Sequence, residues 1–186
     1  MRTIPLLNIM AIAIGLGACT DDAPVPGDEA EVQAQVLAID YYFIRNKQTG
    51  NVIDVSGGNP APGTPLIAYP RKATGTDNQL WALIPSGASG YYFIRNKQTG
   101  QVIDVSGGNV APGTRLVAYP QKTSGTDNQL WALVPSGATG YYLIRSKQTG
   151  QVIDVSGANP APGTPIIIYP RKTSGTDNQL WELVRA

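Results

Sequence analysis

The stretch YYFIRNKQTG at residues 41–50 returns unchanged at residues 91–100 and, with two substitutions, at residues 141–150. It opens a unit of fifty residues, and the units 41–90 and 91–140 are identical at 41 of 50 positions. A third unit follows the same course over residues 141–186. A fixed period without insertions predicts that the units hold equivalent places in one symmetric body. A site present in one unit is then expected in all three.

Apolar side chains alternate within each unit with a period of two residues, which indicates β-strands rather than helices. In the first unit we expect strands over residues 42–45, 52–55, 66–69 and 79–84, separated by segments rich in Gly, Pro, Ser and Thr. The first two strands flank a short turn that ends at Gly50, so we expect them to form a hairpin.

Twelve short strands in three equal groups predict an all-β domain with the β-trefoil fold. In that fold a six-stranded barrel is capped by three hairpins, and pseudo-three-fold symmetry relates the three four-stranded repeats. Barrel closure also removes exposed sheet edges. A three-bladed propeller is smaller than the usual blade count of that fold, and a solenoid normally has atypical terminal repeats. We therefore expect one domain over residues 41–186.

The first residues have the pattern of a targeting segment rather than of a folded element. Arg2 precedes an apolar stretch over residues 4–16 that is too short to span a bilayer. The stretch ends in LGAC at residues 16–19, which resembles the bacterial lipobox. The resemblance implies a lipoprotein signal peptide over residues 1–18 and lipidation of Cys19, which would anchor the protein to a membrane of the bacterial cell envelope, on its periplasmic or its surface face. The alternative is an ordinary cleavable signal with an incidental cysteine.

Residues 19–40 are acidic and contain proline, which is typical of a solvated tether. The six acids between residues 20 and 40 have no basic counterpart there, whereas residues 41–186 contain 13 Lys and Arg against 7 Asp and Glu. These basic residues are scattered rather than gathered in a stripe, so we expect no nucleic-acid partner.

Several catalytic chemistries are excluded by composition. The chain contains no histidine, and Cys19 is its only cysteine. Nucleophile pairs that use histidine and histidine-ligated metals are therefore excluded, as is an internal disulfide. The sequence also shows no phosphate-binding glycine loop and no dense acidic loop for calcium. We expect no enzyme activity, no cofactor and no metal site.

Each unit ends in the motif NQLW, at residues 78–81, 128–131 and 178–181. This motif resembles the Gln-x-Trp signature of the ricin-B-type β-trefoil lectins. Two further marks of that family lie in register, the GNVIDV stretch at residues 50–55 and the Gly63-Thr64 pair. The resemblance covers residues 41–186 and implies a sugar-binding module with up to one shallow pocket in each repeat.

The resemblance also implies which residues bind carbohydrate. An aspartate on the second strand would accept hydrogen bonds from sugar hydroxyls, an aromatic residue on the third strand would stack on the sugar ring, and an asparagine before the Gln-x-Trp motif would bind another hydroxyl. The implied residues are Asp54, Tyr69, Asn78, Asp104, Tyr119, Asn128, Asp154, Tyr169 and Asn178. The glutamine and tryptophan of the motif are expected to be mostly structural.

The residues themselves leave local alternatives open. Asp54 could cap the turn at residues 56–57, Tyr69 could pack on the barrel, and Asn78 could form an Asx-turn. Lys72 and its equivalents Lys122 and Lys172 lie just past the aromatic residue and could reach a sugar, although their pattern favours solvated loop lysines. One departure from the family is the apolar residue two positions before the aromatic, where many members have glutamine: Ile67, Val117 and Ile167.

The sequence thus predicts a non-catalytic, carbohydrate-binding lectin module anchored to the bacterial envelope, with a polysaccharide or glycan as partner. We expect a monomer. The alternative is a structural or adhesion trefoil that binds protein, which the missing pocket glutamine favours.

Overall fold

The computed structural model describes residues 39–186, and the predicted signal peptide, Cys19 and nearly all of the predicted tether lie outside the described residues. Each unit contributes four strands and two short 3-10 helices. The first unit has β1 (Tyr42–Asn46), β2 (Val52–Val55), η1 (Ser56–Gly58), β3 (Thr64–Tyr69), η2 (Asp77–Gln79) and β4 (Trp81–Pro85). The second has β5 (Tyr92–Asn96), β6 (Val102–Val105), η3 (Ser106–Gly108), β7 (Leu116–Tyr119), η4 (Thr126–Gln129) and β8 (Trp131–Pro135). The third has β9 (Tyr142–Ser146), β10 (Val152–Val155), η5 (Ser156–Ala158), β11 (Thr164–Tyr169), η6 (Asp177–Gln179) and β12 (Trp181–Arg185).

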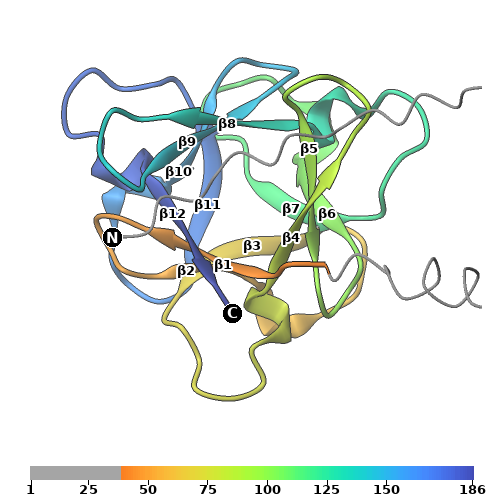
Figure 1. The fold of residues 1–186 in the computed structure, drawn as a ribbon, viewed down its shortest axis with the longest axis horizontal. Helices are drawn as coiled ribbons and strands as arrows, with labels where there is room; N and C mark the ends of the chain where they lie inside the picture. Colours follow the sequence, from red (N-terminus) through yellow and green to blue (C-terminus); the bar gives the residue numbers. More distant parts are fainter. Residues whose placement is uncertain (1–38) are drawn as a thin grey trace, which may run out of the picture. The chain divides into compact units, whose positions relative to one another are not determined.

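The four predicted strands are present in every unit. Residues 39–186 contain no α-helix, so the predicted all-β class is also confirmed. Accordingly, this part of the chain has no helix that is both long and apolar enough to cross a membrane. The three units surround a common centre, with the first drawn in orange and yellow, the second in green and the third in blue (Figure 1).

Six strands form a closed ring. β1 pairs with β12, β12 with β9, β9 with β8, β8 with β5, β5 with β4, and β4 with β1 again, all antiparallel. The first and fourth strands of every unit therefore form the barrel, and the long pairings run between units. Because the ring closes on itself, none of these six strands is left as a sheet edge.

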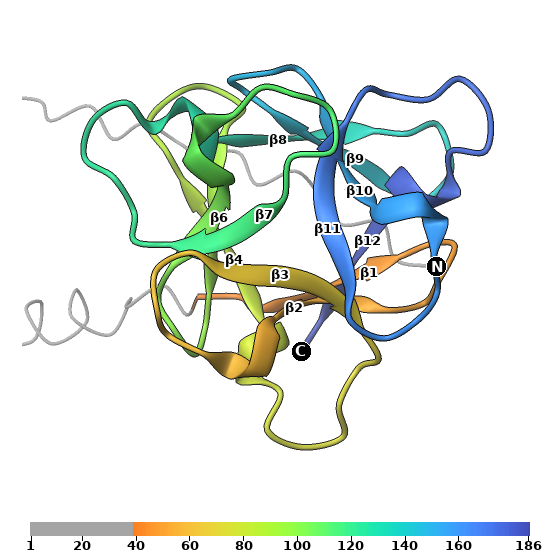
Figure 2. The same ribbon diagram turned by 180° about the vertical axis from the view of Figure 1, so that it is seen from behind.

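The remaining six strands form three hairpins at one end of the barrel: β2 with β3, β6 with β7, and β10 with β11. The third strands of the units also contact one another, because β3 pairs with both β7 and β11, and Arg115 bridges to Ile167. Seen from behind, β3, β7 and β11 surround the centre of this cap (Figure 2).

The predicted hairpin between the first two strands of each unit is confirmed only next to its turn, where the strands pair antiparallel. β1 and β2 share a single pair, Arg45 with Val52, whereas β1 and β12 share five. The turn after β1 is tight, with the Gly50 N–H donating to the Asn46 carbonyl over 3.0 Å. The chain then leaves the barrel, and β1 pairs along its length with β12, the last strand of the third unit.

The core lies inside the barrel and under the cap. Trp81, Trp131 and Trp181 are fully buried and belong to one cluster with isoleucine, leucine and valine side chains of all three units. Each indole N–H also donates to a carbonyl of its own hairpin, as Trp81 does to Ile53 over 2.9 Å. The tryptophan of the motif is therefore structural, as expected, because it joins the barrel to the cap.

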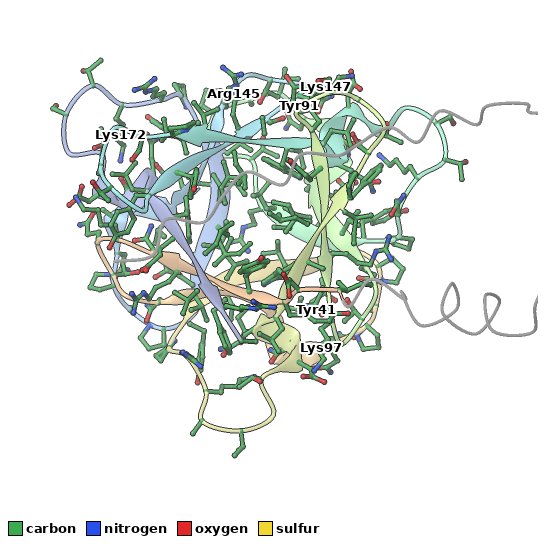
Figure 3. All side chains as sticks on the ribbon, in the orientation of Figure 1. Tyr41, Tyr91, Lys97, Arg145, Lys147 and Lys172 are labelled. Carbon is green, nitrogen blue, oxygen red and sulfur yellow. The ribbon has the colours of Figure 1, made fainter. Side chains whose placement is uncertain are left out.

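An aromatic, a lysine and an aspartate meet where one unit borders the next. The Lys97 ammonium lies 5.6 Å from the centre of the Tyr41 ring and 2.9 Å from Asp77 Oδ1. Lys147 has the same relation to Tyr91, at 6.0 Å (Figure 3). Because the lysine comes from the following unit in each case, these exposed contacts join neighbouring units.

Candidate functional site

A carboxylate on the second strand lies at the centre of the candidate site in each unit. Asp54 is only 2% exposed, and its two oxygens accept hydrogen bonds from two amides. Asn78 Nδ2 donates to Oδ1 over 2.9 Å, and Gln79 Nε2 donates to Oδ2 over 2.9 Å. Asn78 also donates to the Val55 carbonyl over 3.0 Å. The carboxylate thus ties the β2–β3 hairpin to η2, the short turn that precedes Trp81.

The glutamine of the motif fixes the loop that follows the third strand. Gln79 Oε1 accepts from the backbone N–H of Lys72 over 2.9 Å, and Nε2 donates to the Pro70 carbonyl over 3.0 Å. The Lys72 ammonium then donates to Asn78 Oδ1 over 2.8 Å and lies 3.6 Å from Asp54 Oδ2. The equivalent ammonium-to-carboxylate distances in the second and third units are 3.6 and 3.5 Å.

The interpretation of Lys72, Lys122 and Lys172 as solvated loop lysines was therefore wrong. Their side chains remain 31–36% exposed although their ammonium groups pair with nearly buried carboxylates. They are the charged groups through which each network reaches solvent. The repeat pattern contained a signal for this role, because lysine recurs in every unit although the residue before it changes from Arg71 to Gln121 and back to Arg171.

Burial raises the pKa of the Asp54 carboxyl above its ordinary value. The hydrogen bond from Gln79, the positive charge of Lys72 and the hydrogen bond from Asn78 all oppose this shift because they favour the ionised form. Asp154 has the same balance of causes, and burial likewise raises the pKa of Asp104 against the opposing effects of Gln129 and Lys122. The lysine and the two amides are thus the groups that make a charged carboxylate tolerable at this depth.

The three tyrosines predicted as stacking residues end β3, β7 and β11. Tyr69, Tyr119 and Tyr169 are 39–40% exposed, so their rings are open to solvent rather than packed in the barrel. In the third unit the Lys172 ammonium lies 6.0 Å from the centre of the Tyr169 ring. An aromatic surface and an ammonium group therefore adjoin at the rim of the network, where Lys172 is labelled (Figure 3).

Two local alternatives from the sequence do not describe the structure. Asp54 is not the cap of η1, which has no side-chain cap, and the Asn78 amide bonds to Asp54 and Val55 rather than within an Asx-turn. The apolar residue that replaces the family glutamine lies opposite the aspartate, as Ile67 does to Asp54. Direct contact of a sugar with the nine predicted residues stays a prediction.

The second unit has a looser network than the other two. Asn128 Nδ2 donates to the Val105 carbonyl over 3.3 Å, and among the hydrogen bonds of residues 39–186 it has none to Asp104. The turn η4 is also one residue longer than η2 and η6.

This difference coincides with one substitution in the next unit. Asn96 clamps the first unit's turn by donating to the carbonyls of Asn78 and Leu80 over 3.1 and 3.2 Å. Asn46 does the same for the third unit's turn. The equivalent residue beside the second unit's turn is Ser146, whose short side chain makes neither contact.

Comparisons with known proteins agree with the fold. The family model described as ricin-type beta-trefoil lectin domain-like matches residues 31–119, 77–169 and 127–186. A comparison with curated protein sequences gave no match.

Three solved structures illustrate the likeness. The designed three-fold symmetric protein ThreeFoil is 33% identical with a TM-score of 0.70, covering 77% of this chain and 97% of ThreeFoil. An exo-β-1,3-galactanase from Clostridium thermocellum is 30% identical with a TM-score of 0.71, covering 80% of this chain but only 30% of the galactanase. The Macrolepiota procera ricin B-like lectin, solved with lactose, is 28% identical with a TM-score of 0.65, covering 82% of this chain and 99% of that lectin.

We predict that Ser146→Asn stabilises the domain by about 1 kcal/mol, the typical net value of a hydrogen bond. The new amide would donate to the carbonyls of Asn128 and Leu130, as Asn96 does in the preceding unit. Urea unfolding measures the change. The matched control is Asn96→Ser, which should lower the free energy of unfolding by a similar amount. A loss with Asn96→Ser but no gain with Ser146→Asn would show that the missing clamp is not what loosens the second unit.

Proposed function

Because the chain belongs to the ricin-type beta-trefoil lectin domain-like family, we propose that it is a carbohydrate-binding protein without catalytic activity. The observation that carries this proposal is that each unit has an exposed tyrosine and a lysine held by a buried carboxylate, and that in the third unit Lys172 lies beside the Tyr169 ring. The lectin from Macrolepiota procera was solved with lactose and the earthworm lectin C-half with GalNAc, which supports a sugar as the ligand class.

The accessible groups suit a sugar ring. The C–H face of a pyranose can lie on an aromatic ring, and its hydroxyls need hydrogen-bond partners at the rim. The Lys72 ammonium has three N–H donors and uses one in its hydrogen bond to Asn78, so another can donate to a sugar oxygen. Asp54 acts mainly by positioning Lys72. Its own oxygens already accept hydrogen bonds from Asn78 and Gln79.

The charge of the site favours a neutral sugar. Each lysine at a tyrosine site is paired with a carboxylate 3.5–3.6 Å away, which offsets its positive charge. An acidic sugar would gain little binding energy from an ammonium group whose charge is already offset, and the nearby aspartate would repel its carboxylate. We therefore assign neutral, hydroxyl-rich glycans to the tyrosine sites.

Three equivalent sites around one axis suit a polymer rather than a single sugar. A shallow site of this kind is expected to bind one sugar with a dissociation constant on the order of 1 mM, about −4 kcal/mol. Linked sites that engage one polysaccharide raise the apparent affinity by roughly 10²–10⁴ without new contacts. Binding to a glycan-coated surface should therefore far exceed binding to a free monosaccharide.

The test is a glycan array followed by affinity chromatography on the best neutral polysaccharide, with the full-length protein in detergent. Changing Tyr69, Tyr119 and Tyr169 together to Ala should abolish retention, because the stacking surface of every site is removed. The single change Tyr69→Ala should shorten retention and leave the other two sites active. Tyr42→Ala, in a barrel strand, is the control for loss of a tyrosine elsewhere.

Retention of the triple variant equal to that of the parent would show that these tyrosines are not the binding sites. A parent protein that binds no neutral glycan at all would favour the alternative of an adhesion trefoil that binds protein. The departure at Ile67, Val117 and Ile167 is the feature of the chain that supports this alternative.

We also propose that Cys19 is lipidated and anchors the protein to the bacterial cell envelope, on the basis of the LGAC sequence at residues 16–19. Mass spectrometry of the protein made in a bacterium should find acyl chains on Cys19, and Cys19→Ser should leave the protein soluble or unprocessed. A Cys19→Ser protein that still fractionates with membranes through an acylated terminus would contradict the lipobox interpretation.

A further inference from the structure

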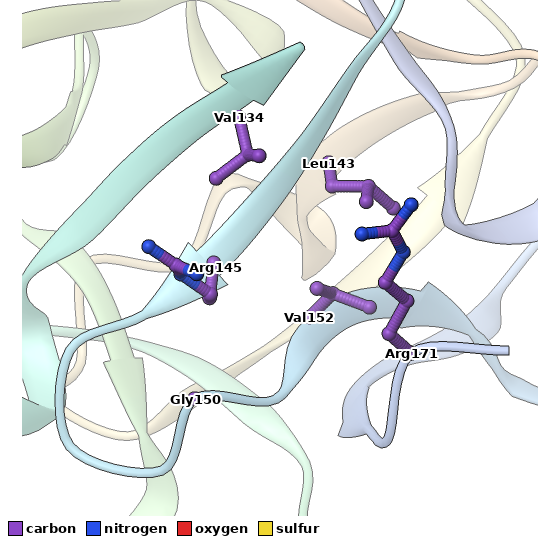
Figure 4. Close-up of a pocket in the computed structure, with 6 residues that line it drawn as sticks. All are labelled: Val134, Leu143, Arg145, Gly150, Val152 and Arg171. Carbon is purple, nitrogen blue, oxygen red and sulfur yellow. The ribbon is translucent and has the colours of Figure 1, made fainter. Parts of the chain in front are cut away.

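The third unit has a small pocket away from its tyrosine. Its lining comprises the side chains of Val134, Leu143, Arg145, Val152 and Arg171, together with Gly150. The volume is about 120 Å³, roughly that of four water molecules in the liquid. The three apolar side chains form the floor, and the two arginines flank it (Figure 4).

In the first unit both arginines at the equivalent position have partners. Arg45 donates to Glu182 Oε2 through Nε over 3.1 Å and through a terminal nitrogen over 2.5 Å. The Arg71 guanidinium lies over the Phe43 ring, 4.0 Å from its centre. Both cations are thus engaged, and the arginine covers the apolar floor.

The second unit has a different arrangement at the same position. Gln121 replaces the second arginine, and Arg95 donates to its Oε1 over 3.3 Å. This unit therefore has one cation, and that cation already has a polar partner.

The arginines of the third unit lack the partners seen in the other two units, because Leu143 is not aromatic and because only Arg45 lies opposite a glutamate, while Arg95 and Arg145 both lie opposite alanine. Leu143 stands where the other units have phenylalanine, so Arg171 has no ring to cover. Arg145 lies opposite Ala132 in the barrel, whereas Arg45 lies opposite Glu182. Within residues 39–186 neither Arg145 nor Arg171 forms an ion pair, and both side chains are exposed.

From these contrasts we infer that the third unit carries a second kind of site, in which Arg145 and Arg171 bind the carboxylate of an acidic sugar over an apolar floor. Guanidinium groups match a planar carboxylate with paired hydrogen bonds. The half-buried Val134, with the buried Leu143 and Val152 beneath it, would contact the C–H face of the ring, and a bare inorganic anion has no such face. The pocket is smaller than a whole sugar, so only the carboxylate and part of the ring would enter it, and the rest of an acidic polysaccharide would run along the surface.

The experiment measures binding of the full-length protein in detergent to polygalacturonate, with fully methyl-esterified polygalacturonate as the neutral probe. The parent should bind the acid form at least about tenfold more tightly than the ester, because esterification removes the charge that the guanidiniums recognise. The double variant Arg145→Gln with Arg171→Gln should lose that preference.

The matched control is the double variant Arg45→Gln with Arg71→Gln, which removes the same charge from the first unit. It should change polygalacturonate affinity less than about twofold, because those guanidiniums already have partners. A third variant, Ala132→Glu with Leu143→Phe, gives Arg145 and Arg171 the kinds of partner that Arg45 and Arg71 have in the first unit. It should lose the preference for the acid form although both arginines remain. Equal losses from the two double arginine variants would overturn the proposal in favour of unspecific charge attraction, and so would unchanged binding by the third-unit variant.

The outcome is separable from that of the tyrosine sites. The variant with Tyr69, Tyr119 and Tyr169 changed to Ala should keep its preference for polygalacturonate over the ester, since none of these residues lines the pocket. If that variant loses the acid preference as well, the arginine pocket is not an independent site.

Discussion

A buried carboxylate that appears three times is the interaction on which the other features depend. Asp54 lies within the cap, and its hydrogen bonds reach Asn78 and Gln79 in the turn before the fourth strand. The fourth strand belongs to the barrel and carries the core tryptophan. One side chain therefore joins cap, turn and barrel, and it does so at a depth where an unpaired charge would be costly. The lysine that compensates it is also the group that the proposed sugar site presents to solvent.

Near-identity of the three units makes their few differences informative. Ser146 in the third unit removes a clamp on the second unit's turn, and Leu143 leaves Arg171 without the aromatic ring that Arg71 covers. Glu182 is a difference of the opposite kind, because it gives Arg45 an acidic partner, whereas Arg145 lies opposite Ala132. Ala158 is a further case, because it adopts a left-handed φ of 54° where the other units have Gly58 and Gly108. Pseudo-symmetry thus supplies three compensated tyrosine sites, whereas departures from it create one uncompensated cationic pocket. We propose neutral sugars for the first kind of site and acidic sugars for the second.

Much of the fold was predictable because the repeat indicates three equivalent units and the period-two pattern indicates β-strands. The strands, the all-β class and the convergence of the tryptophans follow from apolar periodicity and from the repetition of NQLW. The main partner of β1 is β12, and the local pattern could not predict it. The short turn at Gly50 is equally compatible with a long hairpin between β1 and β2. The role of Lys72 was missed because a lysine between a proline and a polar loop has the local pattern of a surface residue. Only the fold brings it to Asp54, which lies eighteen positions earlier in the sequence.

The central claim is tested most directly by urea unfolding of Asp54→Asn, with Asp77→Asn as the control. Asp54→Asn keeps the shape but turns an amide donor toward Asn78 or Gln79, and neither can rotate without losing its other bonds to Lys72, Val55 or Pro70. We expect a loss of about 1–3 kcal/mol in the free energy of unfolding. Asp77 is exposed and forms a surface ion pair with Lys97, so its change should cost less than about 1 kcal/mol. Equal and small effects of the two changes would contradict the account, because the buried carboxylate would then not hold cap, turn and barrel together.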